Sequence, residues 1–186
     1  MTTAPILIDL QNDYFPGGAM ELAGADDAVA QARSLLNAFR ERAWPIFHIQ
    51  HHAEESGATF FVPGTPGADI HRTVLPSPAE PVITKHFPSA FRDTPLLERL
   101  RALGASKLVV AGMMTHMCVD TTVRAAADLG FDCQLAHDAC ATRALEFLGT
   151  RVGAEQVQLA YLAALADGFA AVQDARSVLT NLTRDV

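Results

Sequence analysis

Short apolar runs alternate along the chain with longer segments in which apolar residues recur at helical spacing. The run that begins at Leu108 is β-branched and uncharged, which is typical of a strand buried on both faces of a parallel sheet. Similar short runs predict further strands over residues 5–9, 44–49, 81–85, 131–137 and 169–172. The segments between them are long enough for the helical crossovers that parallel strands need.

Those intervening segments have the period of amphipathic helices. The helix expected over residues 26–43 has an apolar face made of Ala28, Ala32, Leu35, Leu36 and Phe39. Further helices are expected after Thr94-Pro95, after Thr115, over residues 153–166 and near 178–182. Strands and helices alternate without a repeat or a linker, which predicts one domain over residues 1–186. The predicted fold class is α/β: a Rossmann-like, three-layer αβα sandwich around a central, mostly parallel six-stranded sheet.

The segment 53–81 departs from this alternation. It is rich in Gly and Pro, has no regular period and is too long for a simple connection. We therefore expect a functional loop, either a lid or an interface loop. Phe60 and Phe61 near its middle would line a pocket or else hold the loop against the rest of the domain.

A candidate nucleophile follows the strand that begins at Leu108. The strand breaks at Gly112, and a helix is expected to start with Thr115 as its N-cap, which makes Cys118 the third helical residue. The unpaired N–H groups and dipole of a helix N-terminus favour a thiolate, and such settings lower the usual cysteine pKa of ~8.5 by about one to five units. The alternative is a small, buried core cysteine. The strand–turn–helix context favours the nucleophile, because ligands gather where such strands end.

Two other strand ends carry charged residues. Asp9 ends the first expected strand and Lys85 ends the third. Taken alone, Asp9 is equally compatible with a turn-forming aspartate, and a lysine at a strand end is more often a solvated surface residue. Because the carboxyl ends of parallel strands lie at one edge of a sheet, Asp9, Lys85 and Cys118 are expected to meet in a single cleft. There they would supply a base, a cation and a nucleophile.

Charge, cysteine spacing and the lack of a nucleotide-binding motif argue against several classes of protein. The formal net charge is −7, and the 14 Lys and Arg residues form no cluster, so a nucleic-acid partner is not expected. We expect no signal peptide and no membrane span. Cys118, Cys133 and Cys140 show no zinc-binding spacing, and their odd number indicates reduced thiols in a cytoplasmic protein, with Cys133 and Cys140 structural. No GxGxxG motif follows the first strand, which disfavours a dinucleotide-binding protein.

Three histidines near the second strand raise the question of a metal. His51 and His52 are adjacent, so on a strand they would point to opposite faces and would not easily share an ion with His48. We therefore expect pocket or interface histidines, with no metal and no cofactor.

At this point the sequence resembles the isochorismatase-like cysteine hydrolase superfamily, which also contains the nicotinamidases. The resemblance spans nearly the whole chain. It is carried by residues 9–15 (DLQNDYF), by Lys85 with the following PSAF of residues 88–91 and Thr94, and most specifically by residues 112–119 (GMMTHMCV). It implies a catalytic triad of Asp9, Lys85 and Cys118. It also implies a cis peptide between Met113 and Met114, and an oxyanion hole formed by the backbone N–H groups of Met114 and Cys118.

Two departures from the family pattern narrow the expected reaction. Nicotinamidases of this family carry an Asp-x-His metal motif after the second strand, where this chain has Gln50-His51-His52-Ala53. Isochorismatases that cleave a vinyl ether typically lack the cysteine, whereas Cys118 is present here. The resemblance therefore implies a cysteine-dependent hydrolase that cleaves an amide-like C–N bond through an acyl-enzyme. The alternatives are a vinyl-ether hydrolase and a non-catalytic, oligomeric ligand-binding scaffold.

The expected partners are a small-molecule substrate and further copies of the chain. Gln11, Phe15, Phe61 and His116 are candidate substrate-binding residues, because they flank the catalytic strand ends or lie in the long loop. Ordinary packing or solvation is an equally good interpretation of each. The two aromatic rings point to a small, flat or cyclic substrate. The resemblance and the long loop also imply a homo-oligomer, either a dimer or a tetramer.

Overall fold

Strand β1 (Thr2–Ile8) lies in the middle of the sheet, and its residues from Ala4 onward are buried. The structure is a computed structural model that describes residues 2–182. β1 pairs in parallel with β2 (Phe47–His51) on one side and with β4 (Ala105–Met113) on the other. β3 (Val82–Lys85), β5 (Asp132–Ala141) and β8 (Ala171–Gln173) complete a sheet of order β3-β2-β1-β4-β5-β8 in which every pair is parallel. The predicted six-stranded parallel sheet is confirmed.

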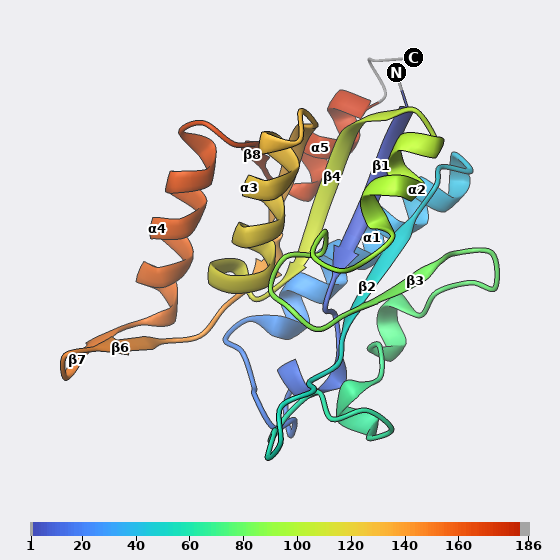
Figure 1. Ribbon diagram of the computed structural model, residues 1–186. Helices are drawn as coiled ribbons and strands as arrows, with labels where there is room; N and C mark the ends of the chain where they lie inside the picture. Colours follow the sequence, from blue (N-terminus) through green and yellow to red (C-terminus); the bar gives the residue numbers. More distant parts are fainter. Residues whose placement is uncertain (1, 183–186) are drawn as a thin grey trace.

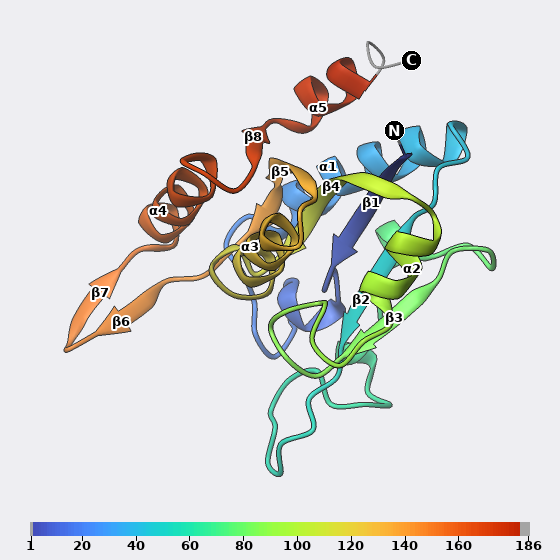
Figure 2. The ribbon, with the colours of Figure 1, turned by 45° about the horizontal axis from the view of Figure 1, so that its top comes forward.

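Helices cover both faces of this sheet (Figure 1). α1 (Ala25–Glu41) and α5 (Ala175–Leu182) pack on one face, while α2 (Leu96–Ala102), α3 (Asp120–Asp128) and α4 (Ala154–Ala166) pack on the other (Figure 2). Three short 3-10 helices, η1 (Asn12–Tyr14), η2 (Pro66–Ala68) and η3 (Arg72–Val74), lie in the loops. This three-layer arrangement confirms the predicted αβα sandwich. No helix in the described part of the chain is long and apolar enough to cross a membrane.

The apolar periodicity placed α1 within two residues of its true ends. Its buried face contains Ala28, Ala32, Leu35, Leu36 and Phe39, all of which pack into the core below it. Asp26 and Asp27 lie in its first turn, where the helix dipole favours negative charge. The helix ends at Glu41, before Ala43 adopts a positive φ of 52°.

The second strand begins later than predicted, at Phe47 instead of Trp44. Trp44 stacks on Phe39 with their ring centroids 5.8 Å apart, so its apolar surface packs against α1 and the strand starts after it. The strand then runs on to His51, two residues past the predicted end. As a consequence, His51 lies at the same edge of the sheet as the ends of β1 and β3.

The order of the strands reverses direction at β1. The chain runs outward from β1 through β2 to β3, and then returns to the far side of β1 as β4. Ligands of open α/β sheets bind at such a switch point, outside the carboxyl ends of the strands. Here β1 and β4 lie so close that a side chain at Gly112, which has a φ of 142°, would overlap the backbone of Ile8. Only glycine fits there.

The sequence analysis did not predict the hairpin that follows β5. After β5, which extends to Ala141 instead of ending near His137, an antiparallel hairpin of β6 (Leu145–Phe147) and β7 (Thr150–Val152) projects from the body of the protein (Figures 1 and 2). Its tip is apolar and open to solvent, with Phe147 76% and Leu148 88% exposed. Each strand has only three residues, too short for an alternating pattern to be recognised in the sequence.

Candidate active site

Asp9 lies immediately after β1 and is fully buried. Its backbone has a positive φ of 49°, and its N–H donates to the carbonyl oxygen of Ile49 at 3.0 Å, which ties the end of β1 to β2. Such backbone outliers in non-glycine residues gather at functional sites. The carboxyl group is therefore held inside the protein at the switch point of the sheet.

Lys85 ends β3 and is also fully buried. Its Nζ lies 2.7 Å from Oδ2 of Asp9, 3.1 Å from Sγ of Cys118 and 2.8 Å from Nδ1 of His51. The contacts with Cys118 and His51 are hydrogen bonds, and the contact with Asp9 is an ion pair. The structure thus brings together Asp9, Lys85 and Cys118, which the sequence analysis placed in one cleft, and Lys85 contacts both of the others.

Cys118 does not lie at the start of a regular α-helix. Residues Thr115–Val119 form a single turn of π-helix, η4, and α3 begins at Asp120. The expectation that Thr115 is the N-cap is wrong: Met114 takes that position, and the hydroxyl of Thr115 donates to the carbonyl oxygen of Ala141 at 3.2 Å. Such wide turns often occur at functional sites. Cys118 is 6% exposed, and the peptide bond between Met113 and Met114 is cis.

The expectation that Cys118 has a lowered pKa is also wrong for this structure. Burial raises the pKa of the thiol and the negative charge of Asp9 raises it further, and together they outweigh the opposing effect of Lys85. Burial likewise raises the pKa of Asp9, against the lowering effect of Lys85. Burial would lower the pKa of Lys85, but Asp9 and Cys118 outweigh it and raise that pKa. The resting site therefore holds a thiol beside a buried ion pair.

A cavity of about 460 Å³ opens beside the thiol. Its wall includes the aromatic residues Tyr14, Phe60, Phe61 and Phe87, the two methionines Met114 and Met117, and the histidines His51 and His86. Small-molecule sites are typically such concave, mostly apolar pockets with a few polar groups. The position of Cys118 in the wall places the sulfur where it can reach a bound molecule.

The long segment 53–81 supplies one wall of this cavity. Phe61, 1% exposed, packs edge-on against Tyr14 with the ring centroids 4.6 Å apart. Its backbone N–H donates to Oδ2 of Asp13 at 2.6 Å, and Oδ1 of the same carboxylate accepts from Ala19 N–H at 3.2 Å. Asp13 thus fixes the aromatic wall to the loop that follows β1.

The other three predicted substrate-binding residues lie outside the wall of this cavity. Gln11 is fully buried, and its amide bonds to the backbones of His51 and Ala68. Phe15 stacks on His71 with the ring centroids 3.9 Å apart. His116 contacts the hydroxyl of Thr142 through Nδ1. Each side chain instead meets a partner that the sequence pattern did not reveal.

Tyr14 contributes to the site and was not predicted, while His51 was expected only as a pocket or interface histidine and not as a partner of Lys85. Tyr14 is buried in the cavity wall, and burial raises its pKa well above the ordinary value, so its phenol stays protonated. His51 ends β2, and the rule that picked Asp9 and Lys85 from strand ends would have found it. The predicted strand stopped at Ile49, which hid that position.

Comparison with known proteins assigns this site to a family. A family model described as the isochorismatase domain matches residues 3–177. The chain belongs to the isochorismatase family. It is therefore a hydrolase of that family, as the resemblance implied, with Asp9 and Cys118 both in contact with Lys85 and with Cys118 in the wall of the cavity.

Individual relatives match over most of this chain. The uncharacterized isochorismatase family protein YddQ of Bacillus subtilis is 46% identical over 179 residues, which cover 96% of this chain and 99% of the relative. A streptothricin hydrolase of Streptomyces noursei is 34% identical over 139 residues, or 75% of this chain and 54% of the relative. The crystal structure of a protein described as an isochorismatase hydrolase from Oleispira antarctica superposes with a TM-score of 0.92 at 44% identity, covering 96% of each chain.

A metal ion would compete with Lys85 in this isochorismatase family site. Ligand atoms of Asp9, His51 and Cys118 lie within 4.8 Å of one another, a grouping that suits an ion such as Zn²⁺. The ammonium of Lys85 already contacts all three residues. An ion at that point would have to displace a buried cation, so Lys85 supplies the positive charge at the centre of the group.

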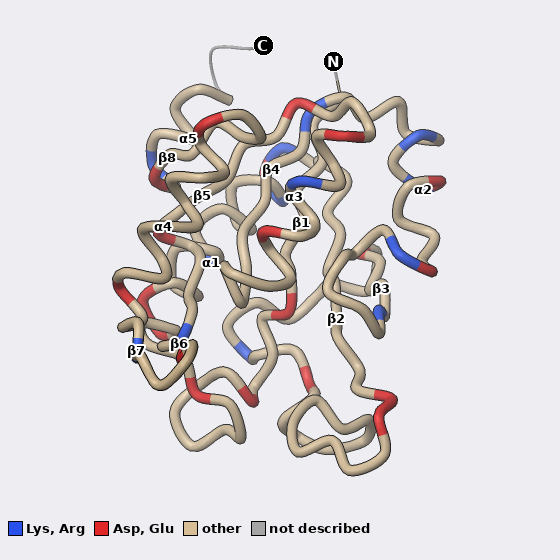
Figure 3. Tube along the Cα trace, turned by 60° about the vertical axis from the view of Figure 1, so that its left-hand side comes forward, with Lys and Arg blue, Asp and Glu red and all other residues tan. Residues whose placement is uncertain are grey.

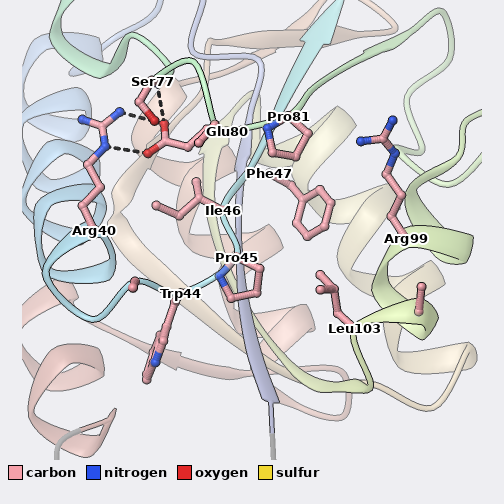
Figure 4. A pocket seen from close by; sticks show the side chains of 13 residues that line it. Arg40, Trp44, Pro45, Ile46, Phe47, Ser77, Glu80, Pro81, Arg99 and Leu103 are labelled. Atoms are coloured by element: carbon pink, nitrogen blue, oxygen red, sulfur yellow. Dashed lines mark hydrogen bonds and ion pairs between the residues drawn. The ribbon is translucent and has the colours of Figure 1, made fainter.

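A second cavity, of about 680 Å³, lies near the start of β2 and is not lined by Asp9, Lys85 or Cys118 (Figure 4). Its wall is mostly apolar and includes Trp44, Phe47 and Leu103. Its rim holds Glu80, whose oxygens accept hydrogen bonds from Arg40 at 2.7 Å. His48 contacts the same carboxylate at 2.9 Å and so belongs to this network instead of the site around Cys118.

The Lys and Arg residues are scattered over the molecule. Figure 3 shows the Lys and Arg positions separated along the trace, without a continuous basic face among the described residues. Among the described residues, the wall of the cavity beside Cys118 contains no Lys or Arg side chain.

Proposed function

We propose that this protein is a cysteine-dependent hydrolase that cleaves an amide-like C–N bond in a small cyclic or aromatic molecule. The observation that carries the proposal is the contact of Lys85 Nζ with both Asp9, at 2.7 Å, and Cys118, at 3.1 Å, where Cys118 lies in the wall of a mostly apolar cavity. This arrangement places a base, a cation and a nucleophile at one point.

In the first half-reaction, Asp9 takes the proton of the Cys118 thiol as the sulfur attacks the carbonyl carbon. The raised pKa values of both groups suit a proton transfer that accompanies attack, without a stable thiolate beforehand. The new oxyanion accepts hydrogen bonds from the backbone N–H groups of Met114 and Cys118. The C–N bond then breaks, and Asp9 returns the proton to the departing nitrogen, which leaves a thioester on Cys118.

In the second half-reaction, water hydrolyses the thioester. Asp9 removes a proton from the water as its oxygen attacks the thioester carbon, and the carbon–sulfur bond breaks. Sulfur regains a proton and the product leaves as an acid. Throughout both halves Lys85 stays charged, because Asp9 and Cys118 hold its pKa above the ordinary value. Its role is to stabilise negative charge as it moves between the carboxylate and the sulfur.

The wall of the cavity favours this reaction over the cleavage of isochorismate. Isochorismate carries two carboxylates, whereas the described wall has no Lys or Arg side chain and does contain Glu55. A pocket for a dianion normally offers cations. One relative is named for the hydrolysis of streptothricin, which supports the view that membership of the family does not fix the substrate. A non-catalytic scaffold would not need the buried, mutually paired Asp9 and Lys85.

Trapping of the acyl-enzyme tests the proposal. Purified protein is screened with small cyclic and aromatic amides, and any substrate that turns over is mixed with enzyme, quenched within milliseconds and examined by intact-mass spectrometry. We expect a mass adduct on the Cys118 peptide in the wild type and none in Cys118→Ala, which should also lose turnover. Turnover by Cys118→Ala at a near-normal rate would exclude the covalent scheme.

We also propose a homo-oligomer in a reducing, cytoplasmic setting. All three cysteines are free. Phe147 and Leu148 are exposed at the tip of the β6–β7 hairpin, and Leu159 is 69% exposed on α4; exposed apolar side chains of this kind favour burial against another copy. Light scattering of the wild type and of Phe147→Asp/Leu148→Asp tests this, with the substituted protein expected to shift to a smaller species. An equal mass for both proteins would exclude the hairpin as the contact.

A further inference from the structure

The two ring nitrogens of His51 have different partners. Nδ1 lies 2.8 Å from Nζ of Lys85, which also donates to Sγ of Cys118 and forms an ion pair with Asp9. Because an ammonium only donates, Nδ1 must accept, and the neutral ring then carries its hydrogen on Nε2. Burial, together with the positive charge of Lys85, lowers the pKa of His51 to about 3, so the ring is neutral at physiological pH.

The Nε2–H group of His51 is free to bind a ligand. No other described residue supplies a hydrogen-bond partner for it, and it is not among the polar atoms sealed away from solvent. His51 is one of the residues that line the cavity, together with Cys118. A donor that is unpaired at the edge of a pocket is the kind of polar group that orients a bound small molecule.

The position of this donor is fixed before any ligand binds. The backbone N–H of His51 donates to Oε1 of Gln11 at 2.7 Å, and Nε2 of Gln11 donates back to the carbonyl oxygen of His51 at 2.8 Å. Lys85 contacts Nδ1 of the imidazole ring. The ring of Phe61 lies beside the imidazole, with the two ring centroids 5.7 Å apart. Pre-organised groups of this kind lower the entropic cost of binding.

The charge of the surrounding wall limits what this donor can bind. The described wall contains no Lys or Arg side chain, and its one carboxylate, Glu55, would repel an anion. The buried Asp9 has its charge matched by Lys85. A neutral N–H donor in such surroundings stabilises an uncharged acceptor, whereas a carboxylate would lose its hydration without meeting a free cation.

We propose that His51 determines substrate specificity by donating a hydrogen bond from Nε2 to a second, uncharged acceptor of the substrate, beyond the carbonyl group that Cys118 attacks. The pocket would thus select neutral amides or imides that carry another carbonyl oxygen or ring nitrogen, over substrates with a carboxylate there. This deepens the proposed function and rests on the same pocket. It differs from a role in which His51 only holds Lys85 in place.

A ligand series and two substitutions separate these roles. The ligands are phthalimide, which is neutral with two carbonyl groups, isoindolin-1-one, which lacks the second carbonyl, and the phthalamate anion. Their dissociation constants are measured by calorimetry at pH 7 on Cys118→Ala, which prevents turnover. His51→Asn, added to this background, keeps an acceptor near Lys85 but removes the N–H donor at the position of Nε2. His51→Gln keeps an N–H near the position of Nε2 but removes the contact with Lys85.

We expect phthalimide to bind about fivefold more tightly than isoindolin-1-one, as one net hydrogen bond predicts. Phthalamate should bind more weakly than either neutral ligand. His51→Asn should weaken phthalimide binding to the level of isoindolin-1-one and leave isoindolin-1-one unchanged, while His51→Gln should retain most of the preference for phthalimide.

Several results would overturn the inference. These are equal loss of both neutral ligands on His51→Asn, phthalamate binding as tightly as phthalimide, or no phthalimide binding at its solubility limit. The comparison of the three ligands on Cys118→Ala needs no His51 variant to fold. Because the assay measures binding alone, it can succeed even if no acyl-enzyme is ever trapped, so its outcome is separate from that of the proposed reaction.

Discussion

Asp9 and Lys85 form an ion pair from which solvent is excluded, with Nζ 2.7 Å from Oδ2 and both side chains 0% exposed. Two buried charges are each costly to dehydrate, and their attraction repays that cost only while both are present. The pair therefore holds the ends of β1 and β3 together at the site. The loss of one partner leaves the other as an unpaired buried charge.

The first prediction concerns the stability of this pair. Asp9→Asn or Lys85→Met alone should lower the free energy of unfolding by about 3 to 5 kcal/mol, because each leaves an unpaired buried charge. The double variant should lose less than the sum of the single losses. Urea denaturation of the four proteins measures the coupling. Additive losses would mean that the two charges do not stabilise each other in the folded protein.

A second prediction concerns the reactivity of Cys118. Asp9 raises the pKa of the thiol and Lys85 lowers it, with burial as the largest raising effect. The rate of alkylation by iodoacetamide should therefore rise with pH through a midpoint above the ~8.5 of a free cysteine. Asp9→Asn removes a negative charge and should lower the midpoint, whereas Lys85→Met should raise it.

Peptide mapping after labelling distinguishes Cys118 from Cys133 and Cys140. Both of these are buried, and burial raises the pKa of each thiol to about 12, so they serve as slow internal controls. A midpoint for Cys118 well below that of a free cysteine would contradict a raised thiol pKa and restore the expectation of a preformed thiolate.

The third prediction follows from the position of Lys85 among three potential metal ligands. Lys85→Ala removes the ammonium and leaves Asp9, His51 and Cys118, whose ligand atoms lie within 4.8 Å of one another. The variant should bind Co²⁺ in a one-to-one complex with a sulfur-to-metal charge-transfer band, and Zn²⁺ should displace it. Wild-type protein and Lys85→Ala/Cys118→Ser are the controls, and neither should show the band. A band of equal strength in the wild type would show that Lys85 does not exclude the ion.

The fourth prediction concerns Glu80 and the stability of the fold at low pH. Burial alone would raise the pKa of Glu80, but hydrogen bonds from Arg40, the Ser77 N–H and His48 outweigh it and lower that pKa from 4.5 to about 2. A carboxyl whose pKa is lower in the folded state stabilises the protein above its unfolded pKa. That contribution is lost as the pH falls from about 4.5 to about 2.

Glu80→Gln should therefore be less stable than the wild type near pH 7, by about 2 kcal/mol for a charged hydrogen-bonded network. The difference should shrink as the pH falls through that window. Denaturation at several pH values measures it, with Glu98→Gln on the exposed face of α2 as the matched control. If the difference in unfolding free energy between the two proteins does not depend on pH, the substitution acts through packing and not through the charge of Glu80.

The elements that position Asp9, Lys85 and Cys118 could be predicted because their signals are local. Apolar runs mark the strands, and the carboxyl ends of parallel strands share an edge, so the pattern brings Asp9 and Lys85 to one edge of the sheet, although it does not by itself assign either a role. The same rule locates Cys118 just beyond β4. It does not reveal the π-helical turn at Thr115, because one extra residue in a turn leaves no mark on the apolar period.

The pocket could not be predicted in this way, because the direction of each side chain depends on contacts between distant residues. Gln11 follows β1 closely, yet its amide bonds to the backbones of His51 and Ala68 instead of facing the cavity. Phe15 stacks on His71, 56 positions later in the chain, for reasons that only the folded loops provide. The prediction of a lowered thiol pKa failed for a similar reason, since burial at this depth is a property of the assembled layers.

The carboxylate of Asp13 links the loop after β1 to the backbone of Phe61 by a buried 2.6 Å hydrogen bond. Contacts within the protein thus hold this wall in place, so binding does not have to order it. Association should then be limited by diffusion through the mouth of the cavity instead of by a slow closing step. Molecules too wide for that mouth would be excluded by their size, before any contact with Cys118 could select among them.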